Sequence, residues 1–506
     1  MTDSSEIYYS SEILTDTPEA SQEKQVPEYK KTECILSVIT FFLALGYTRF
    51  VIFNTTGFIS TALNIAIITA AIIYLKFKKF TFSRFSVILA AVLYLFSFVF
   101  SITANNFIKV LDAIFLFAGG AYFVYSVTAE KKDIERFLPY ALGKAVFEYP
   151  FSRFGTQFRI TTDALGKSKF GSSLKMVILG LVLTIPLTSI VAGLLMSADN
   201  GLKEMLSGIT GFFFSDNLFT SVMQLMVAVP CSFYLFGMLY SNSFRSELNV
   251  LSSEECEKKL SSARLINNII LYTAVTPILV LYVLFFISQA NYFLSAFSGS
   301  LPAGYSYADY ARQGFFELFA VTLINLTVII ITSLAAKDGG RNKPAALKIY
   351  TTLLSLFTLI LIATAVSKMV MYISVYGLTP LRVYTTWFMI LCAVIFVMII
   401  IKQFHFDFRF ARWSTAAFTI MFGILCFSRP EAVIANYNIS MYQSGSLEEL
   451  DTDQLLDMSD DGLLTAVKKG VISAEEAGDK KDGIYYSNPY SRLNISSYLL
   501  EKEIVN

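Results

Sequence analysis

The chain alternates long apolar runs with short polar connections from residue 35 to residue 428. A helix needs about 20 mostly apolar residues to cross a bilayer, and about eleven runs meet that length. They lie at residues 35–53, 58–75, 85–104, 107–127, 175–197, 218–241, 266–288, 314–335, 348–374, 382–401 and 410–428. The pattern predicts an all-α fold, a polytopic bundle of transmembrane helices.

Basic residues follow a second pattern, because they alternate from one connection to the next. Lys and Arg gather in residues 24–31, 76–84, 131–175, 245–264, 337–348 and 402–412, whereas the intervening connections hold few of them. Short connections rich in Lys and Arg stay in the cytoplasm. We therefore expect a cytoplasmic N-terminus and an extracytoplasmic C-terminus.

Three stretches do not read as spans. Residues 1–33 carry acidic residues among serines and threonines, which predicts a disordered cytoplasmic tail before the transmembrane domain at 34–428. The long cytoplasmic connection 128–174 mixes basic and apolar positions, so we expect a helix on the inner leaflet, with a protein-binding surface as the alternative. Residues 429–506 predict an acidic extracytoplasmic tail with two or three short helices, one begun by a capping box from Ser473 to Glu476.

Composition agrees with a chain that lies mainly in lipid. Hydrophobic residues make up 55% and aromatic residues 15%, and the mean hydropathy is +0.57. A net charge of +1 gives no reason to expect a nucleic-acid partner. His405 is the single histidine, the cysteines form no C-x-x-C pair, and Asp451, Asp453 and Asp457 lack the glycine of a calcium loop. We therefore expect no metal or cofactor, and the lipid bilayer as the main partner.

One acidic residue stands out in the apolar runs. Glu317 follows Asp309 and Arg312 into a predicted span, where an ionised carboxylate is costly unless it is paired or hydrated. Lys368 is the best partner, because at about 1.5 Å per residue it reaches a similar depth in the next span. The full predicted charge cluster is Glu317, Lys368, Asp309, Arg312, Tyr310, Tyr372, Tyr376, Arg382 and Asp112, although a pair with Lys109 explains Asp112 more simply. This cluster is either a structural tie between two spans or a protonatable or solute-binding centre.

Several motifs carry a family resemblance. The stretches "LLMSADN", "YSYADYARQGFFEL", "AVSKMVMYISVYGLTPLRVYTTWF", "RPEAVIANYNI" and "LDTDQLLDMSDD" occur in this order. Over residues 85–465 the chain resembles a family of bacterial multi-pass membrane proteins described only as a domain of unknown function. The family often has arginine where this chain has Lys368, which keeps the charge and loses the planar fork. The resemblance implies a bacterial plasma membrane protein of shared architecture and no particular reaction.

Two functions remain open from the sequence. The first is a transporter-like protein with its polar centre between the eighth and ninth predicted spans. The second is a non-enzymatic signalling or envelope-assembly component that engages a protein through residues 128–174 or through the acidic tail. An enzyme is disfavoured, because the chain shows neither paired catalytic carboxylates nor a serine–lysine arrangement.

Overall fold

The computed structural model describes residues 31–54, 57–128, 138–166, 216–244, 266–288, 315–337, 343–405, 407–487 and 493–505, with a few single positions between them. The named elements in this part of the chain are all helices. Ten helical stretches are long and apolar enough to cross a membrane, and they correspond to ten of the predicted spans. The prediction of an all-α, multi-pass protein is confirmed, while the predicted span 175–197 lies outside the described residues.

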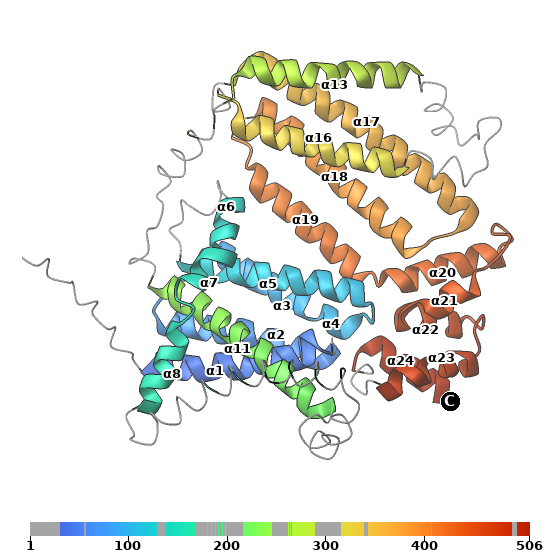
Figure 1. Cartoon of the computed structure of the whole chain (residues 1–506). Helices are drawn as coiled ribbons and strands as arrows, with labels where there is room; N and C mark the ends of the chain where they lie inside the picture. Colours follow the sequence, from blue (N-terminus) through green and yellow to red (C-terminus); the bar gives the residue numbers. More distant parts are fainter. Residues whose placement is uncertain are drawn as a thin grey trace, which may run out of the picture.

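A first group of spans surrounds one apolar core. Its members are α1 (Lys31–Tyr47) with the π-helical end η1 (Thr48–Ile52), α2 (Gly57–Phe77), α3 (Arg84–Ser97), the short α4 (Val99–Ile102), α5 (Asn106–Thr128) and α11 (Asp216–Ser243). α1 packs along α11 and α3 packs along α5, with Leu75, Leu93 and Phe123 buried between helices. These helices form the lower group in Figure 1.

A second group of spans has its own core. It contains α13 (Asn268–Ser288), α16 (Phe315–Ala335), α17 (Ala345–Tyr376) and α18 (Pro380–Phe404). Leu361, Met389 and Phe396 are buried in it. The next span, α19 (Phe410–Phe427), lies between the two groups (Figure 1). Its Phe422 belongs to the first core and its Phe410 packs against the second, so α19 joins the two groups.

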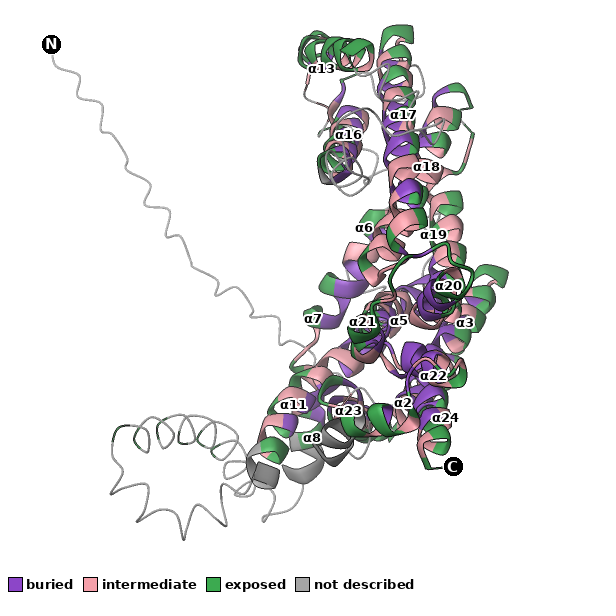
Figure 2. Cartoon of the chain, turned by 90° about the vertical axis from the view of Figure 1, so that its right-hand side faces the viewer, coloured by how far each residue is buried: buried purple, intermediate pink, exposed green. Residues whose placement is uncertain are grey.

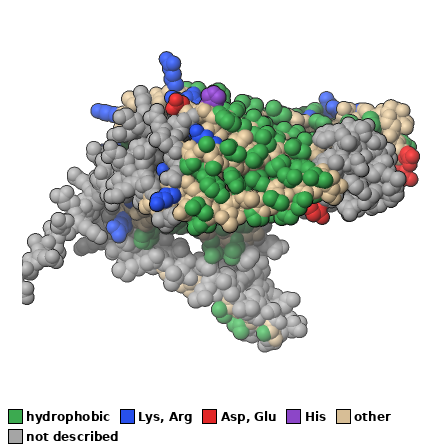
Figure 3. All heavy atoms as spheres, turned by 90° about the horizontal axis from the view of Figure 1, so that it is seen from above, with side chains coloured by type: hydrophobic (Ala, Val, Ile, Leu, Met, Phe, Trp, Pro, Cys, Tyr) green, Lys and Arg blue, Asp and Glu red, His purple; other side chains and the backbone are tan. Residues whose placement is uncertain are grey.

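The outermost span of the second group exposes apolar side chains. Ile269 and Ile287 of α13 are 68% and 70% exposed, and Leu281 and Leu284 are also more than half exposed. Figure 3, which looks down on this face, shows hydrophobic side chains covering most of its described surface. A helix apolar all round needs an apolar environment on its free side. Contact with lipid chains accounts for this surface, as expected for an integral membrane protein.

Residues 138–166 are packed into the first group rather than lying only on the membrane surface. They form α6 (Leu138–Gly143), η2 (Lys144–Glu148), α7 (Tyr149–Ser152) and α8 (Thr156–Gly166). The buried amide of Gln157 donates to Ser37 O at 2.9 Å and to Ser232 Oγ at 2.7 Å, which ties α8 to α1 and α11. Phe147 and Phe151 remain exposed on the same segment. The expectation of a helix simply resting on the inner leaflet is therefore incomplete, because this segment also closes the bundle.

Gly237 allows a close backbone approach between α7 and α11. A Cβ atom at Gly237 would lie 2.2 Å from the carbonyl oxygen of Pro150 in α7. We expect Gly237→Ala to lower the unfolding free energy by about 1 to 3 kcal/mol, since backbone must move to accept it. Thermal unfolding in detergent measures this loss. Gly120→Ala in α5 is the control, since nothing lies within 4 Å of a Cβ there; equal melting temperatures for the two variants would contradict the packing.

The residues after α19 form a small helical unit with its own core. It consists of α20 (Pro430–Gln443), α21 (Thr452–Asp457), α22 (Asp460–Lys468), α23 (Ala474–Ser487) and α24 (Ile495–Val505), which is more helix than the sequence predicted. Ile434, Leu463 and Leu500 are buried in its core, and Figure 2 shows buried positions concentrated around α22. The predicted capping box is confirmed, because Ser473 Oγ accepts from Glu476 N and the Glu476 carboxylate accepts from Ser473 N, both at 3.1 Å.

Candidate functional site

Asp461 of α22 is the centre of a buried contact between the C-terminal helices and the spans. Its side chain is fully buried and accepts hydrogen bonds from two hydroxyl groups, Thr103 Oγ1 and Ser496 Oγ. The backbone N–H of Ala104 donates to the same carboxylate at 3.0 Å, and Arg429 Nε lies 2.9 Å from it in an ion pair. Hydrogen bonds to an ionised acceptor are about twice as strong as neutral ones. Asp461 therefore joins α22, α24, the α19–α20 turn and the start of α5.

The N-terminus of α5 is a favourable place for the Asp461 carboxylate. The chain is extended at Thr103 after α4, and Asn105 Oδ1 accepts from Ile108 N at 2.9 Å, which caps the helix. The Asn105 amide also donates to the Tyr384 hydroxyl of α18 at 3.1 Å. Free N–H groups and the positive end of the helix dipole favour an anion at this place. The carboxylate of Asp461 fills that role for α5.

The turn between α19 and α20 supplies the cation. Arg429 adopts the left-handed conformation with φ 51°, and Pro430 then begins α20. Glu431, in the first turn of α20, accepts from Ser459 N at 2.7 Å, immediately before α22. The turn therefore directs Arg429 toward Asp461 and holds the beginning of α22 from the other side.

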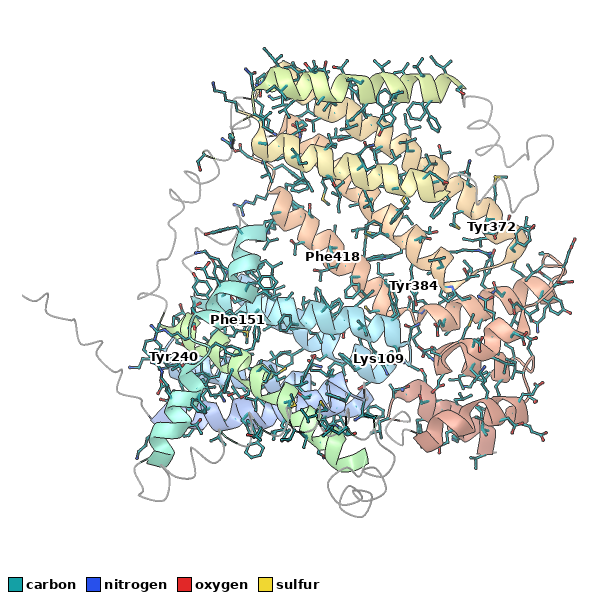
Figure 4. The ribbon with its side chains drawn as sticks, viewed as in Figure 1. Lys109, Phe151, Tyr240, Tyr372, Tyr384 and Phe418 are labelled. Carbon is teal, nitrogen blue, oxygen red and sulfur yellow. The ribbon has the colours of Figure 1, made fainter. Side chains whose placement is uncertain are left out.

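Lys109 extends this group into the membrane-spanning part of α5. Its side chain is only 3% exposed, and it is attracted electrostatically by Asp461 and Asp460. The Asp460 carboxylate itself accepts a hydrogen bond from Ser497 Oγ of α24. In Figure 4, Lys109 and Tyr384 lie near the ends of their helices that face the C-terminal unit. A buried lysine needs such acidic neighbours to offset its desolvation.

Asp112 lies one turn further along α5 and is different from the other acids. It is fully buried, and neither carboxylate oxygen accepts a hydrogen bond from any residue in the described part of the chain, Lys109 included. Asp112 therefore forms no hydrogen bond with Lys109, and the expected i, i+3 pair between them stays a prediction. Asp112 has electrostatic neighbours in Tyr47 of α1 and Cys426 of α19. Burial of an unpaired ionised carboxylate costs several kcal/mol, so this group needs a proton or a cation.

The charged and hydroxyl side chains at the contact between the C-terminal helices and the spans, together with Asp112, are called the junction cluster below. It comprises Thr103, Lys109, Asp112, Arg429, Asp460, Asp461 and Ser496. Two bases face three acids in this set, so acidic groups are in excess. Among the described residues no group of three or more His, Cys, Asp and Glu side chains is arranged to hold a metal ion.

A second contact joins the C-terminal unit to the turn between α17 and α18. Asn438 of α20 pairs with Leu378 through two hydrogen bonds, accepting from its N–H at 2.6 Å and donating to its carbonyl at 2.8 Å. Arg382 donates to the carbonyl of Gly377 at 2.6 Å and lies 4.0 Å from the ring centroid of Tyr372. The C-terminal unit therefore touches both groups of spans.

The structure brings together only part of the predicted charge cluster. Glu317 attracts Lys368 electrostatically across the packed helices α16 and α17. Glu317 is nevertheless exposed in the first turn of α16, rather than buried as expected. On α17, the ring of Tyr376 contacts that of Tyr372 and its carbonyl accepts from Arg382 at 3.1 Å. Asp112 belongs to the first group of spans, and Asp309, Tyr310 and Arg312 lie outside the described residues.

Asp460, Asp461 and Arg429 were not predicted as site residues from the sequence. They lie in the motifs "LDTDQLLDMSDD" and "RPEAVIANYNI", but no sequence pattern indicated which residues they contact. Thr103 and Asp461 are separated by 358 positions in the chain. A signal did exist, because adjacent acids at the start of a helix and an arginine before Pro430 are candidates for buried contacts.

Comparison with known proteins finds one family. The family described as Domain of unknown function (DUF4153) matches residues 85–468. The match therefore runs from α3 through the end of α22 and includes most of the junction cluster. No curated protein and no solved structure matches the chain.

Proposed function

The chain belongs to this family of unknown function, and from that premise we propose that it is a transporter-like membrane protein that binds and releases a proton at Asp112. The observation that carries the proposal is the burial of Asp112 in a span with neither carboxylate oxygen hydrogen-bonded by a described residue. Ionisable groups at such depth are common on transport and proton-relay paths. The polar centre then lies on α5 rather than between α16 and α17.

The surroundings of Asp112 favour a proton over a metal cation. Hard cations such as calcium take about six to eight oxygen ligands. Within the described structure, the hydroxyl of Tyr47 and the thiol of Cys426 are two electrostatic neighbours of Asp112. Neither offers a charged oxygen. A proton neutralises the carboxyl without any further ligand.

The remaining features fit this proposal as structural support. Glu317 of α16 attracts Lys368 of α17 electrostatically, while the C-terminal unit covers the end of α5 that carries Lys109. The protein would lie in a bacterial plasma membrane with its N-terminus in the cytoplasm and the C-terminal unit outside, as the alternation of basic connections predicts.

Asp112→Asn tests the proposal in two steps. Infrared difference spectra between acidic and alkaline buffer should show a carboxylic-acid C=O band that the variant lacks, because Asn keeps the shape and cannot ionise. In proteoliposomes with a trapped pH dye and an imposed potassium potential, proton entry should fall at least tenfold in the variant. Asp457→Asn is the control, because that side chain is 71% exposed and pairs with Lys480. Equal spectra and equal flux in wild type and Asp112→Asn would refute the proposal.

A further inference from the structure

The turn between α2 and α3 lies at the membrane surface. Both helices are candidate spans, at Gly57–Phe77 and Arg84–Ile102, and six residues connect them. A connection this short between two spans has to stay at the depth of the lipid headgroups. Its side chains therefore meet headgroups, whichever leaflet they face.

Three cations of this turn are exposed and unmatched by acids. Lys76, Lys79 and Arg84 are all exposed, and none forms an ion pair with another described residue. Lys78 is the contrasting case, because Glu33 neutralises it and its ammonium lies 4.8 Å from the ring centroid of Phe244. Lys78 therefore stabilises the fold, whereas the charges of Lys76, Lys79 and Arg84 are accessible to ligands outside the protein.

Apolar side chains border these charges. Phe77 is 70% exposed and Phe85 is 41% exposed, next to the cations in the chain, and Ile88 is 63% exposed one turn further along α3. Aromatic and aliphatic groups beside cations suit the boundary between headgroups and acyl chains. A soluble polyanion would not explain the exposed phenylalanines.

Lys79 has an unfavourable backbone conformation in the turn that ends α2. Phe80 N bonds to Leu75 O at 3.1 Å and Lys79 N bonds to Lys76 O at 2.9 Å, which is the Schellman motif at the end of α2. Lys79 has φ 63° at the position where this motif usually has glycine. A lysine there costs about 1 kcal/mol relative to glycine. A strained charged residue in place of the favoured glycine points to a use for the side chain.

We propose that the α2–α3 turn is a binding site for the headgroup of an anionic phospholipid, with Lys76, Lys79 and Arg84 as its cationic ligands. The phosphate of the lipid interacts with these cations, and Phe77 and Phe85 contact its acyl chains. This site is independent of the proton chemistry proposed for Asp112.

Lys79→Gly separates the binding role of Lys79 from its structural role. Glycine relieves the left-handed backbone, so the variant should melt at a slightly higher temperature in plain detergent. It should also bind phosphatidylglycerol about fivefold more weakly, since each basic residue near an anionic surface contributes about that factor. The measurement is a titration of delipidated protein with phosphatidylglycerol, followed by thermal unfolding and native mass spectrometry.

The triple variant Lys76→Gln, Lys79→Gly, Arg84→Gln should lose roughly a hundredfold in phosphatidylglycerol affinity, the product of three such factors. Its control removes three lysines from the C-terminal unit, as Lys468→Gln, Lys469→Gln, Lys480→Gln, and should bind like wild type. Three results would overturn the site: equal affinity for phosphatidylcholine in the wild type, an unchanged affinity in the triple variant, or equal stabilisation by millimolar inorganic phosphate alone.

Discussion

Asp461→Asn should release the C-terminal helices from the ends of the spans. The carboxylate accepts from Thr103, Ala104 and Ser496 and pairs with Arg429, and it is fully buried. Asparagine keeps the size but has no charge, and its NH₂ group faces donors. The N–H and O–H donors lose an ionised acceptor, which costs about 1 to 3 kcal/mol, while Arg429, whose side chain is 28% exposed, can turn to water.

Hydrogen exchange followed by mass spectrometry measures this release region by region. Peptides from α22 and α24 should exchange much faster in Asp461→Asn, while peptides from α17 should keep their wild-type protection. Faster exchange over the whole protein would instead indicate global unfolding, and the milder Ser496→Ala, which removes one hydroxyl donor, then serves to detect local release. Asp457→Asn, at an exposed acid of the neighbouring helix α21, is the matched control. Unchanged exchange of α22 in both junction variants would show that Asp461 does not hold the unit.

The sequence was sufficient for those parts of the fold that depend on local physics. A span is recognisable because about 20 apolar residues have few other stable environments, and ten predicted spans match helices of the right length. The capping box from Ser473 to Glu476 was also predictable, since both partners lie within one turn.

The site was less predictable, because its contacts join distant parts of the chain. The depth argument predicted Lys368 near Glu317, and Glu317 attracts Lys368 electrostatically, but depth along one helix does not determine which side of that helix faces protein. In the same way, a pair with Lys109 was the simplest local explanation of Asp112. Lys109 is also attracted by Asp460 and Asp461, which the sequence could not place beside α5.

Gly377→Ala should also be strongly destabilising, because two independent effects add. Gly377 ends α17 with φ 71° and ψ −174°, a conformation that is essentially restricted to glycine and costs another residue about 1 to 3 kcal/mol. A Cβ atom would also lie 2.6 Å from Asn438 Oδ1. That oxygen accepts from Leu378 N, so moving it away leaves a partly buried donor without its acceptor, at a further cost of about 1 kcal/mol.

Gly445→Ala separates these two effects. Gly445 has nearly the same φ, 72°, but nothing lies within 4 Å of a Cβ there, so the control carries the penalty of a positive φ without the clash. Thermal unfolding in detergent should therefore show a clearly larger loss for Gly377→Ala. The clash also predicts non-additivity: once Asn438→Ala has removed the amide, adding Gly377→Ala should cost less than it does in the wild type. If the two losses simply add, Asn438 is not the group that restricts position 377.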